Sequence, residues 1–139
     1  MIHITHFDHI QMDVANLEES MEFYHRVFGF RLVEVGLRAG VRWAIVGNTA
    51  GLYLCMHEFA QGRGKSNDGL EITHFGLVVE GFDRADGRLR AAGVPMVYTQ
   101  SVQYHSSRSL YFFDPNVYKI EISESSGGGL DARMKELYG

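Results

Sequence analysis

Several residue types and patterns are scarce in this chain of 139 residues, and each scarcity excludes a class of protein. Cys55 is the single cysteine, so no disulfide can form within the chain, and we expect a reducing compartment, the cytoplasm. No apolar run approaches the roughly 18 residues of a membrane-spanning helix, and we see no secretory signal at the N-terminus. With 13 basic against 17 acidic residues, the sequence predicts neither a nucleic-acid partner nor a membrane partner.

The residues that are present describe an ordinary globular chain with a surplus of histidine. Hydrophobic residues make up 45% of the sequence and charged residues 22%, which is enough to build a core without disulfides. Seven histidines accompany the single cysteine. A metal site in this chain would therefore be built from imidazole and carboxylate groups.

Apolar periodicity and turn residues predict the same order of elements twice along the chain. The first copy has a strand over 4–13, a helix between an N-cap at Asn16 and a stop at Gly29, and strands over 31–37, 41–46 and 52–58. The second copy has a strand over 71–79, a helix over 82–92, and strands over 96–102, 110–113 and 118–123. A short tail helix carries Leu130, Met134 and Leu137 on one face, and we expect it to pack on the body or on a partner chain.

Matching intervals indicate that the two copies arose by duplication of one βαβββ unit. Gly29 and Cys55 lie 20 and 46 residues after His9, and Gly93 and Glu121 lie 19 and 47 residues after His74. We predict an α+β fold of two paired βαβββ modules that form curled mixed sheets around a metal-binding cavity, with a short C-terminal helix. The predicted boundaries are 1–60 for the first module, 61–70 for an inter-module loop, 71–124 for the second module, and 125–139 for a linker and the tail helix.

Three side chains are the candidate metal ligands. His9 and His74 hold the same place in the two copies, and Glu121 lies in the last strand of the second copy. Strand alternation puts Glu121 on the face opposite Ile120 and Ile122. If the sheets curl around one cavity, two imidazoles and one carboxylate would meet there, and this donor set suits Fe(II), Mn, Zn or Ni with open positions for a substrate.

At these residues the sequence resembles the vicinal oxygen chelate superfamily, which includes glyoxalases, bleomycin-resistance proteins, fosfomycin-resistance enzymes and extradiol dioxygenases. The segments that carry the resemblance are 7–10, 16–32, 72–75, 110–116 and 120–122. The resemblance implies a divalent metal ion held by His9, His74 and Glu121, a small-molecule substrate, and a homodimer whose modules pair within one chain or across two.

Within that superfamily, the pattern is most similar to fosfomycin-resistance enzymes, at 51–56, 108–111 and 130–133. That likeness implies that Tyr111 and Arg133 contact the phosphonate and that an epoxide is opened by a thiol or water. The remaining substrate-binding candidates are Gln11, Ser109 and Trp43. Gln11 replaces a threonine of that pattern, 106–109 replaces an acidic loop, and the phosphonate-binding lysine is missing, with Ser101 nearest its place. Cys55 stands where glyoxalases carry a fourth ligand, which argues against that branch.

Two other functions remain open at this stage. An extradiol-type Fe(II) dioxygenase would use a tyrosine ten residues before the ligand glutamate, as Tyr111 is, and a histidine upstream, for which His105 is the candidate. His57 shares a strand face with Cys55 and is a candidate base or fourth ligand. The third possibility is a non-catalytic drug-binding protein of the bleomycin-resistance type, which would need no metal.

Overall fold

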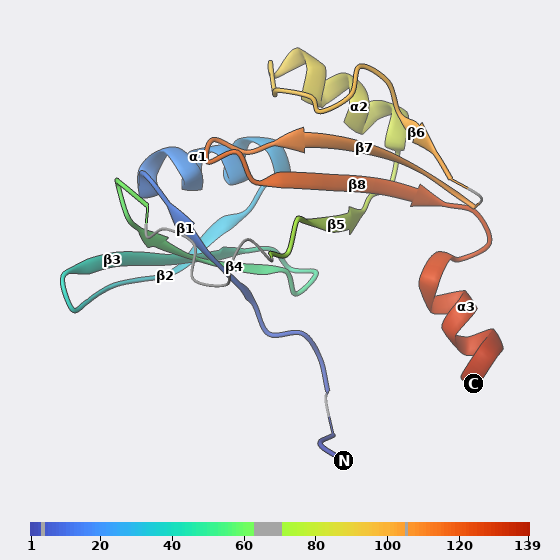
Figure 1. Ribbon diagram of the computed structural model, residues 1–139, viewed down its shortest axis with the longest axis horizontal. Coiled ribbons are helices and arrows are strands. Elements are labelled where there is room, and N and C mark those ends of the chain that lie inside the picture. Colours follow the sequence, from blue (N-terminus) through green and yellow to red (C-terminus); the bar gives the residue numbers. More distant parts are fainter. Residues whose placement is uncertain (4, 63–70, 105) are drawn as a thin grey trace. The chain divides into compact units, whose positions relative to one another are not determined.

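The computed structural model describes residues 1–3, 5–62, 71–104 and 106–139 of the chain. The chain divides into two units, Met1–Gly69 and Leu70–Gly139. Each unit contains one four-stranded mixed sheet, and a third helix ends the chain (Figure 1). The α+β class and the two βαβββ sheets agree with the sequence prediction, and the sheets do not close into barrels.

The first unit runs β1 (Ile10–Val14), α1 (Leu17–Phe28), β2 (Arg31–Arg38), β3 (Val41–Gly47) and β4 (Tyr53–Glu58). Its strand order is β1-β4-β3-β2, with β1 parallel to β4 and the other pairs antiparallel. Alternate side chains of these strands are buried with α1, among them Met12, Ala44 and Met56. Among the described residues of this unit, no helix covers the opposite face of the sheet.

The second unit repeats this plan with β5 (His74–Val78), α2 (Phe82–Ala91), β6 (Val102–Gln103), β7 (Ser107–Phe113) and β8 (Lys119–Ser125). Its strand order is β5-β8-β7-β6, with β5 parallel to β8. The final helix, α3 (Gly129–Tyr138), follows β8.

Local signals at the ends of α1 are confirmed. The Asn16 side chain accepts a hydrogen bond from the backbone N–H of Glu19 at 2.9 Å, which satisfies a donor of the first turn. Gly29 ends the helix in the left-handed conformation with φ 70°, which is sterically easy for glycine because it has no Cβ atom.

The duplication is also visible in the turns that lead into β4 and β8. The Asn48 side-chain oxygen accepts hydrogen bonds from the backbone N–H groups two and four residues further on, those of Ala50 and Leu52. The Asp114 carboxylate does the same with Asn116 and Tyr118. The same side-chain-capped turn therefore sets the start of the last strand in both units.

Two predicted strands differ most from the structure in extent. The first strand begins at Ile10, after an exposed segment, and the strand expected over 96–102 is reduced to one bridge from Met96 to Phe112 and the two-residue β6. Arg90 of α2 explains the second difference, because its guanidinium donates to the Thr99 carbonyl oxygen at 2.8 Å. That carbonyl is therefore bound by the helix and not by a neighbouring strand.

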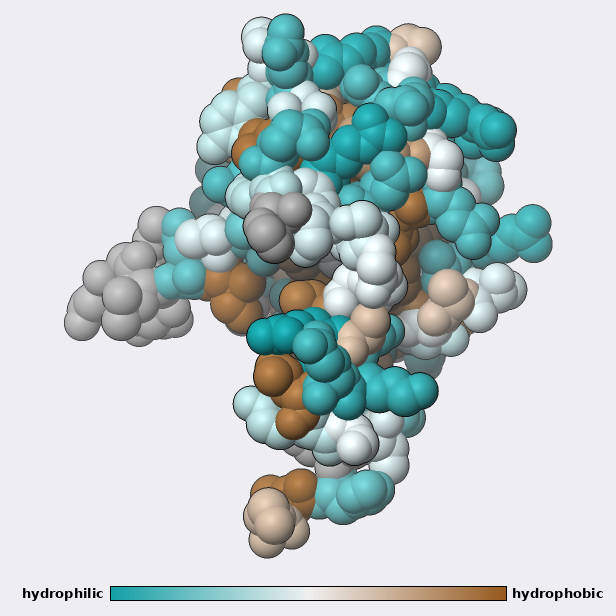
Figure 2. Space-filling view, turned by 90° about the vertical axis from the view of Figure 1, so that its right-hand side faces the viewer, coloured by the Kyte–Doolittle hydropathy of each residue, from teal (hydrophilic) through white to brown (hydrophobic). Residues whose placement is uncertain are grey.

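The tail helix forms as predicted, but none of its residues is buried within the described chain. Leu130, Met134 and Leu137 are each more than half exposed. Figure 2 shows patches of hydrophobic residues exposed among hydrophilic ones on this face of the molecule. No helix in the described segments has both the length and the apolar character needed to cross a membrane.

Candidate functional site

The open face of the second sheet carries the candidate site. Side chains of β7 and β8 alternate, so one set is buried with α2: Leu110, Phe112, Ile120 and Ile122. The other set includes Tyr111 and Glu121, which are cross-strand partners. His74 begins β5 on the other side of β8. Three adjacent strands thus bring these polar groups to one face.

His74 and Glu121, two of the three predicted metal ligands, are in direct contact. Nε2 of His74 lies 3.1 Å from Oε2 of Glu121, and the two side chains are 33% and 19% exposed. Gly76 is the register partner of Glu121 on β5. Because a Cβ atom at Gly76 would stand 3.5 Å from Glu121 Oε2, glycine leaves the space beside this carboxylate open.

Ser109 fixes the other oxygen of the same carboxylate. Its fully buried hydroxyl donates to Oε1 of Glu121 at 2.6 Å. With Oε1 held in this way, Oε2 is directed toward His74. Ser109 was predicted to bind substrate, and in this structure its hydroxyl is engaged by the glutamate.

Tyr111 is enclosed by three aromatic side chains. Its ring meets those of His74 and Tyr98 edge to face, with centroids 5.6 and 5.7 Å apart, and its hydroxyl lies 2.5 Å from the hydroxyl of Tyr104. Burial raises the pKa of the Tyr111 phenol well above its usual value, and the hydroxyl of Tyr104 and the carboxylate of Glu121 raise it further. Tyr111 is therefore protonated at neutral pH.

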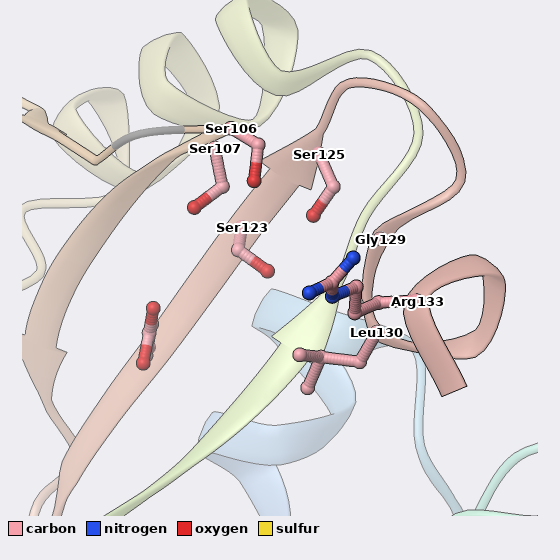
Figure 3. Close-up of a pocket in the computed structure, with 8 residues that line it drawn as sticks. Ser106, Ser107, Ser123, Ser125, Gly129, Leu130 and Arg133 are labelled. Carbon is pink, nitrogen blue, oxygen red and sulfur yellow. The ribbon is translucent and has the colours of Figure 1, made fainter. Parts of the chain in front are cut away.

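A pocket of about 650 Å³ opens beside Glu121 (Figure 3). Its remaining lining residues come from β7, β8, α3 and the turn before β7: Ser106, Ser107, Ser123, Ser125, Gly129, Leu130 and Arg133. The serine hydroxyls and the Arg133 guanidinium face the same space. Hydroxyl and guanidinium donors of this kind suit an oxygen-rich or anionic ligand.

The first unit holds the other predicted residues. His9 precedes β1, is partly exposed, and lies with Nδ1 2.5 Å from Oδ2 of Asp8. Gln11, Trp43 and His57 alternate with the buried side chains of β1, β3 and β4, which places them on the face that α1 leaves open.

Cys55 lies on the same strand as His57 and is buried. Burial raises the pKa of its thiol, and the charge of Glu34 adds to the effect. Leu54 and Met56 on either side of it are also buried, which is typical of a small packing residue.

The structure brings together part of the predicted site. His74, Glu121, Ser109 and Tyr111 form one connected group in the second unit, whereas no cluster of three or more His, Cys, Asp or Glu side chains occurs within the described ranges. The metal site with His9 stays a prediction. His105 lies outside the described residues.

Sequence reasoning missed Tyr98, one of the two tyrosines that enclose Tyr111, and most of the serines that line the pocket. One signal for the serines was present in the sequence. Serines at 107 and 109 and at 123 and 125 share the parity of Glu121, which places them on its face of the sheet. Tyr98 carried no such signal, because it lies outside the regular strands.

Comparison with known proteins agrees with this architecture. The family model of the Glyoxalase/Bleomycin resistance protein/Dioxygenase superfamily matches residues 6–122. The chain is similar to a glyoxylase/bleomycin resistance protein/dioxygenase domain from Frankia sp. EAN1pec, with 19% identity, a TM-score of 0.77, and 91% of this chain and 96% of that chain covered.

Two structures of the fosfomycin resistance protein FosX from Listeria monocytogenes are also similar. One has 21% identity, a TM-score of 0.71, and coverage of 94% of this chain and 99% of that chain. The other is a FosX mutant in complex with Mn(II) and 1S,2S-dihydroxypropylphosphonic acid, with 20% identity, a TM-score of 0.70, and coverage of 95% and 99%. At such identities these likenesses show the fold alone.

Proposed function

This chain belongs to the glyoxalase/bleomycin resistance protein/dioxygenase superfamily, and on that premise we propose that it is a divalent-metal-dependent enzyme acting on an oxygen-rich small molecule. The contact between His74 and Glu121 is the observation that carries the proposal. His9, from the equivalent place in the first unit, is the third proposed ligand. Fe, Mn, Zn and Ni all accept this combination of donors.

The residues in the second unit fit a divalent ion. An imidazole nitrogen and a carboxylate oxygen face each other at 3.1 Å, and the carboxylate is oriented by a buried hydroxyl, as ligand carboxylates in metal sites are. Without a cation, this carboxylate has the imidazole and the serine as its neighbours. If a divalent cation were bound, His74 and Glu121 would both be its ligands.

Side chains of the second unit would supply proton donation and substrate binding. A bound divalent ion supplies Lewis acidity toward a substrate oxygen. The Tyr111 phenol keeps its proton at neutral pH and can donate it in a hydrogen bond to an oxygen that gains negative charge. Arg133 and the pocket serines bind and orient the polar end of the substrate.

The reaction we favour is opening of an epoxide of the fosfomycin type. A thiol or a water molecule attacks an epoxide carbon, one C–O bond breaks, and the released oxygen takes up a proton, so the product is a hydroxy thioether or a diol. The similarity to FosX, which has been crystallised with Mn(II) and a dihydroxypropylphosphonic acid, supports this choice over other reactions.

An Fe(II)-dependent extradiol ring cleavage is the second candidate. Tyr111 favours it, because a protonated phenol packed edge-on against His74 is placed to act as a general acid toward an oxygen of the catechol. This reaction consumes O2 and a catechol, so it is separable from epoxide opening by its co-reactants.

We also propose that the protein is a homodimer. Strand β2 lies at the edge of the first sheet, and its apolar side chains Leu32, Val33, Val35 and Leu37 are all more than half exposed. An exposed apolar edge strand of this length is a site for pairing with another chain. Sedimentation velocity of the purified protein gives the oligomeric state directly.

The first experiment measures metal content and affinity in the wild type, Glu121→Gln and Glu80→Gln. Glu80 is an exposed glutamate of the same unit and serves as the matched control. We expect near-stoichiometric binding of Mn(II), Fe(II) or Zn(II) by the wild type and by Glu80→Gln, and loss of binding by Glu121→Gln. Drug binding without metal, unaffected by Glu121→Gln, would overturn the enzyme proposal in favour of a sequestering protein.

The second experiment chooses between the two reactions. Fosfomycin is incubated with the Mn(II)-loaded protein with and without glutathione, and the products are followed by ³¹P NMR. Catechols are tested with the Fe(II)-loaded protein by oxygen uptake. Phosphonate turnover supports epoxide opening, and oxygen uptake without phosphonate turnover replaces it with ring cleavage.

A further inference from the structure

Tyr111 has two tyrosine neighbours of nearly equal exposure that meet it in different ways. Tyr104 is 48% exposed and approaches with its hydroxyl, 2.5 Å from the hydroxyl of Tyr111. Tyr98 is 52% exposed and approaches with its ring, at a centroid distance of 5.7 Å and an interplanar angle of 90°. Removal of the hydroxyl from Tyr104 therefore tests hydrogen bonding to Tyr111, and the same change at Tyr98 is a control in which only packing against Tyr111 is involved.

The two phenol hydroxyls share one short hydrogen bond, in which either oxygen can be the donor. Tyr111 is also the cross-strand partner of Glu121, and its ring meets that of His74 edge to face. The bond to Tyr104 therefore fixes the position of the Tyr111 hydroxyl next to the two proposed ligands.

We propose that Tyr104 is a positioning residue, whose hydroxyl holds the Tyr111 phenol in place beside the ligand bound at His74 and Glu121. This inference rests on the proposed function, because it assigns Tyr104 a role in the same site.

The backbone keeps Tyr104 in place. Its N–H donates to the Ser107 carbonyl oxygen at 2.8 Å, across the turn that joins β6 to β7. Tyr111 lies on β7, within the central part of the sheet. The Tyr104 hydroxyl thus reaches a residue of β7 that lies seven positions further along the chain.

The kinetic test compares Tyr104→Phe with Tyr98→Phe in the Mn(II)-loaded protein, with fosfomycin as substrate. Both substitutions keep the aromatic ring, and melting temperatures check that both variants fold. We expect Tyr104→Phe to lower kcat about tenfold, the effect of one lost hydrogen bond, with KM and Mn(II) affinity within about twofold of the wild type. Tyr98→Phe is expected to match the wild type.

Coupling to Tyr111 is tested with the double variant. If Tyr104 acts through Tyr111, the double variant Tyr104→Phe/Tyr111→Phe has the same kcat as Tyr111→Phe alone. A further loss in the double variant would show that Tyr104 acts independently and would overturn the proposal. Equal losses in Tyr104→Phe and Tyr98→Phe would do the same, because packing would then explain both.

A spectroscopic measurement decides the inference without turnover. In protein labelled with ¹³C at the tyrosine Cζ, the Tyr111 signal reports the hydrogen bonding of its hydroxyl. We expect the signal to move in Tyr104→Phe and to stay in Tyr98→Phe, which retains the ring beside it. An unmoved signal in Tyr104→Phe overturns the inference. Absence of phosphonate turnover in the wild type, with the signal still moving, overturns the proposed reaction and leaves the inference standing.

Discussion

The two sheets have the same strand order, but their open faces carry different chemistry. Equivalent register positions make the difference explicit: Cys55 lies between Gln11 and Ile45, whereas Glu121 lies between Gly76 and Tyr111. At the centre of one face stands a buried thiol whose pKa is raised by burial. At the centre of the other stands a carboxylate that contacts an imidazole and a serine hydroxyl.

The comparison teaches that the backbone plan alone does not create a site. Both units place a side chain at the middle of the last strand, facing away from the helix. In the first unit that side chain is small and neutral, so the position contributes packing. In the second unit it is charged, and Ser109 and Gly76 are the neighbours that hold it and leave it room.

Exchange of the two central residues for alanine should have the largest effect. We expect Glu121→Ala to lower metal affinity by more than about 100-fold, beyond the 10–100-fold typical of residues that only support a ligand. Cys55→Ala should leave metal affinity within about twofold of the wild type. Calorimetric titration with Mn(II) measures both, and equal losses would mean that the two units share the ligand role.

Removal of the hydroxyl that orients Glu121 comes next. Ser109→Ala frees Oε1 of the carboxylate and should weaken Mn(II) binding by about 10–100-fold. Ser123→Ala is the control, because Ser123 is the cross-strand partner of Ser109 and lines the pocket. Unchanged Mn(II) affinity in Ser109→Ala would show that Glu121 needs no support.

The two capped turns should differ in their contribution to stability. Asp114→Ala removes an acceptor for two backbone N–H groups at a buried position and should lower the free energy of unfolding by about 2 kcal/mol. Asn48→Ala removes the same pair of bonds at a more exposed position, and we expect about 1 kcal/mol. Urea unfolding measures both, with the exposed Asp131→Ala as control.

The smallest effect concerns backbone strain in these same turns. Val117 adopts φ 65°, a conformation that a β-branched residue strongly disfavours, whereas Gly51 occupies the matching turn with φ 84°. Val117→Gly should raise the free energy of unfolding by about 0.5–1 kcal/mol, since relief of strain exceeds the added freedom of the unfolded chain. Gly51→Val should lower it by about 1 kcal/mol. A stability loss in Val117→Gly would show that the Val117 side chain compensates for its backbone.

Local signals explain how much of the fold the sequence could predict. The Asn16 cap and the Gly29 stop depend on neighbouring residues, so both were readable in the sequence and both are confirmed. The buried parity of Ile120 and Ile122 followed from alternation along a strand, and it is also confirmed. The α+β class and the repeated order of elements along the chain follow from the same short-range patterns.

Contacts between distant residues explain what the sequence could not give. The strand expected over 96–102 is interrupted because Arg90 binds the Thr99 carbonyl, an interaction between a helix and a loop that no periodicity encodes. The Tyr104–Tyr111 hydrogen bond joins a residue outside the regular strands to one on β7. At the site, the contact of His74 with Glu121 joins residues 47 positions apart, and the matched spacing of the two copies and the family resemblance were the signals that pointed to it.

The Asp114 turn also determines which changes in length the second half of the protein can tolerate. Two backbone N–H groups bound to this carboxylate set the starting point of β8, directly before Lys119. One codon inserted or deleted between Lys119 and Glu121 would rotate every later side chain to the other face, which would press Glu121 against α2 and expose Ile122. Single substitutions on the open face would change what the site binds, whereas a single-codon length change in β8 would remove the site and the core together.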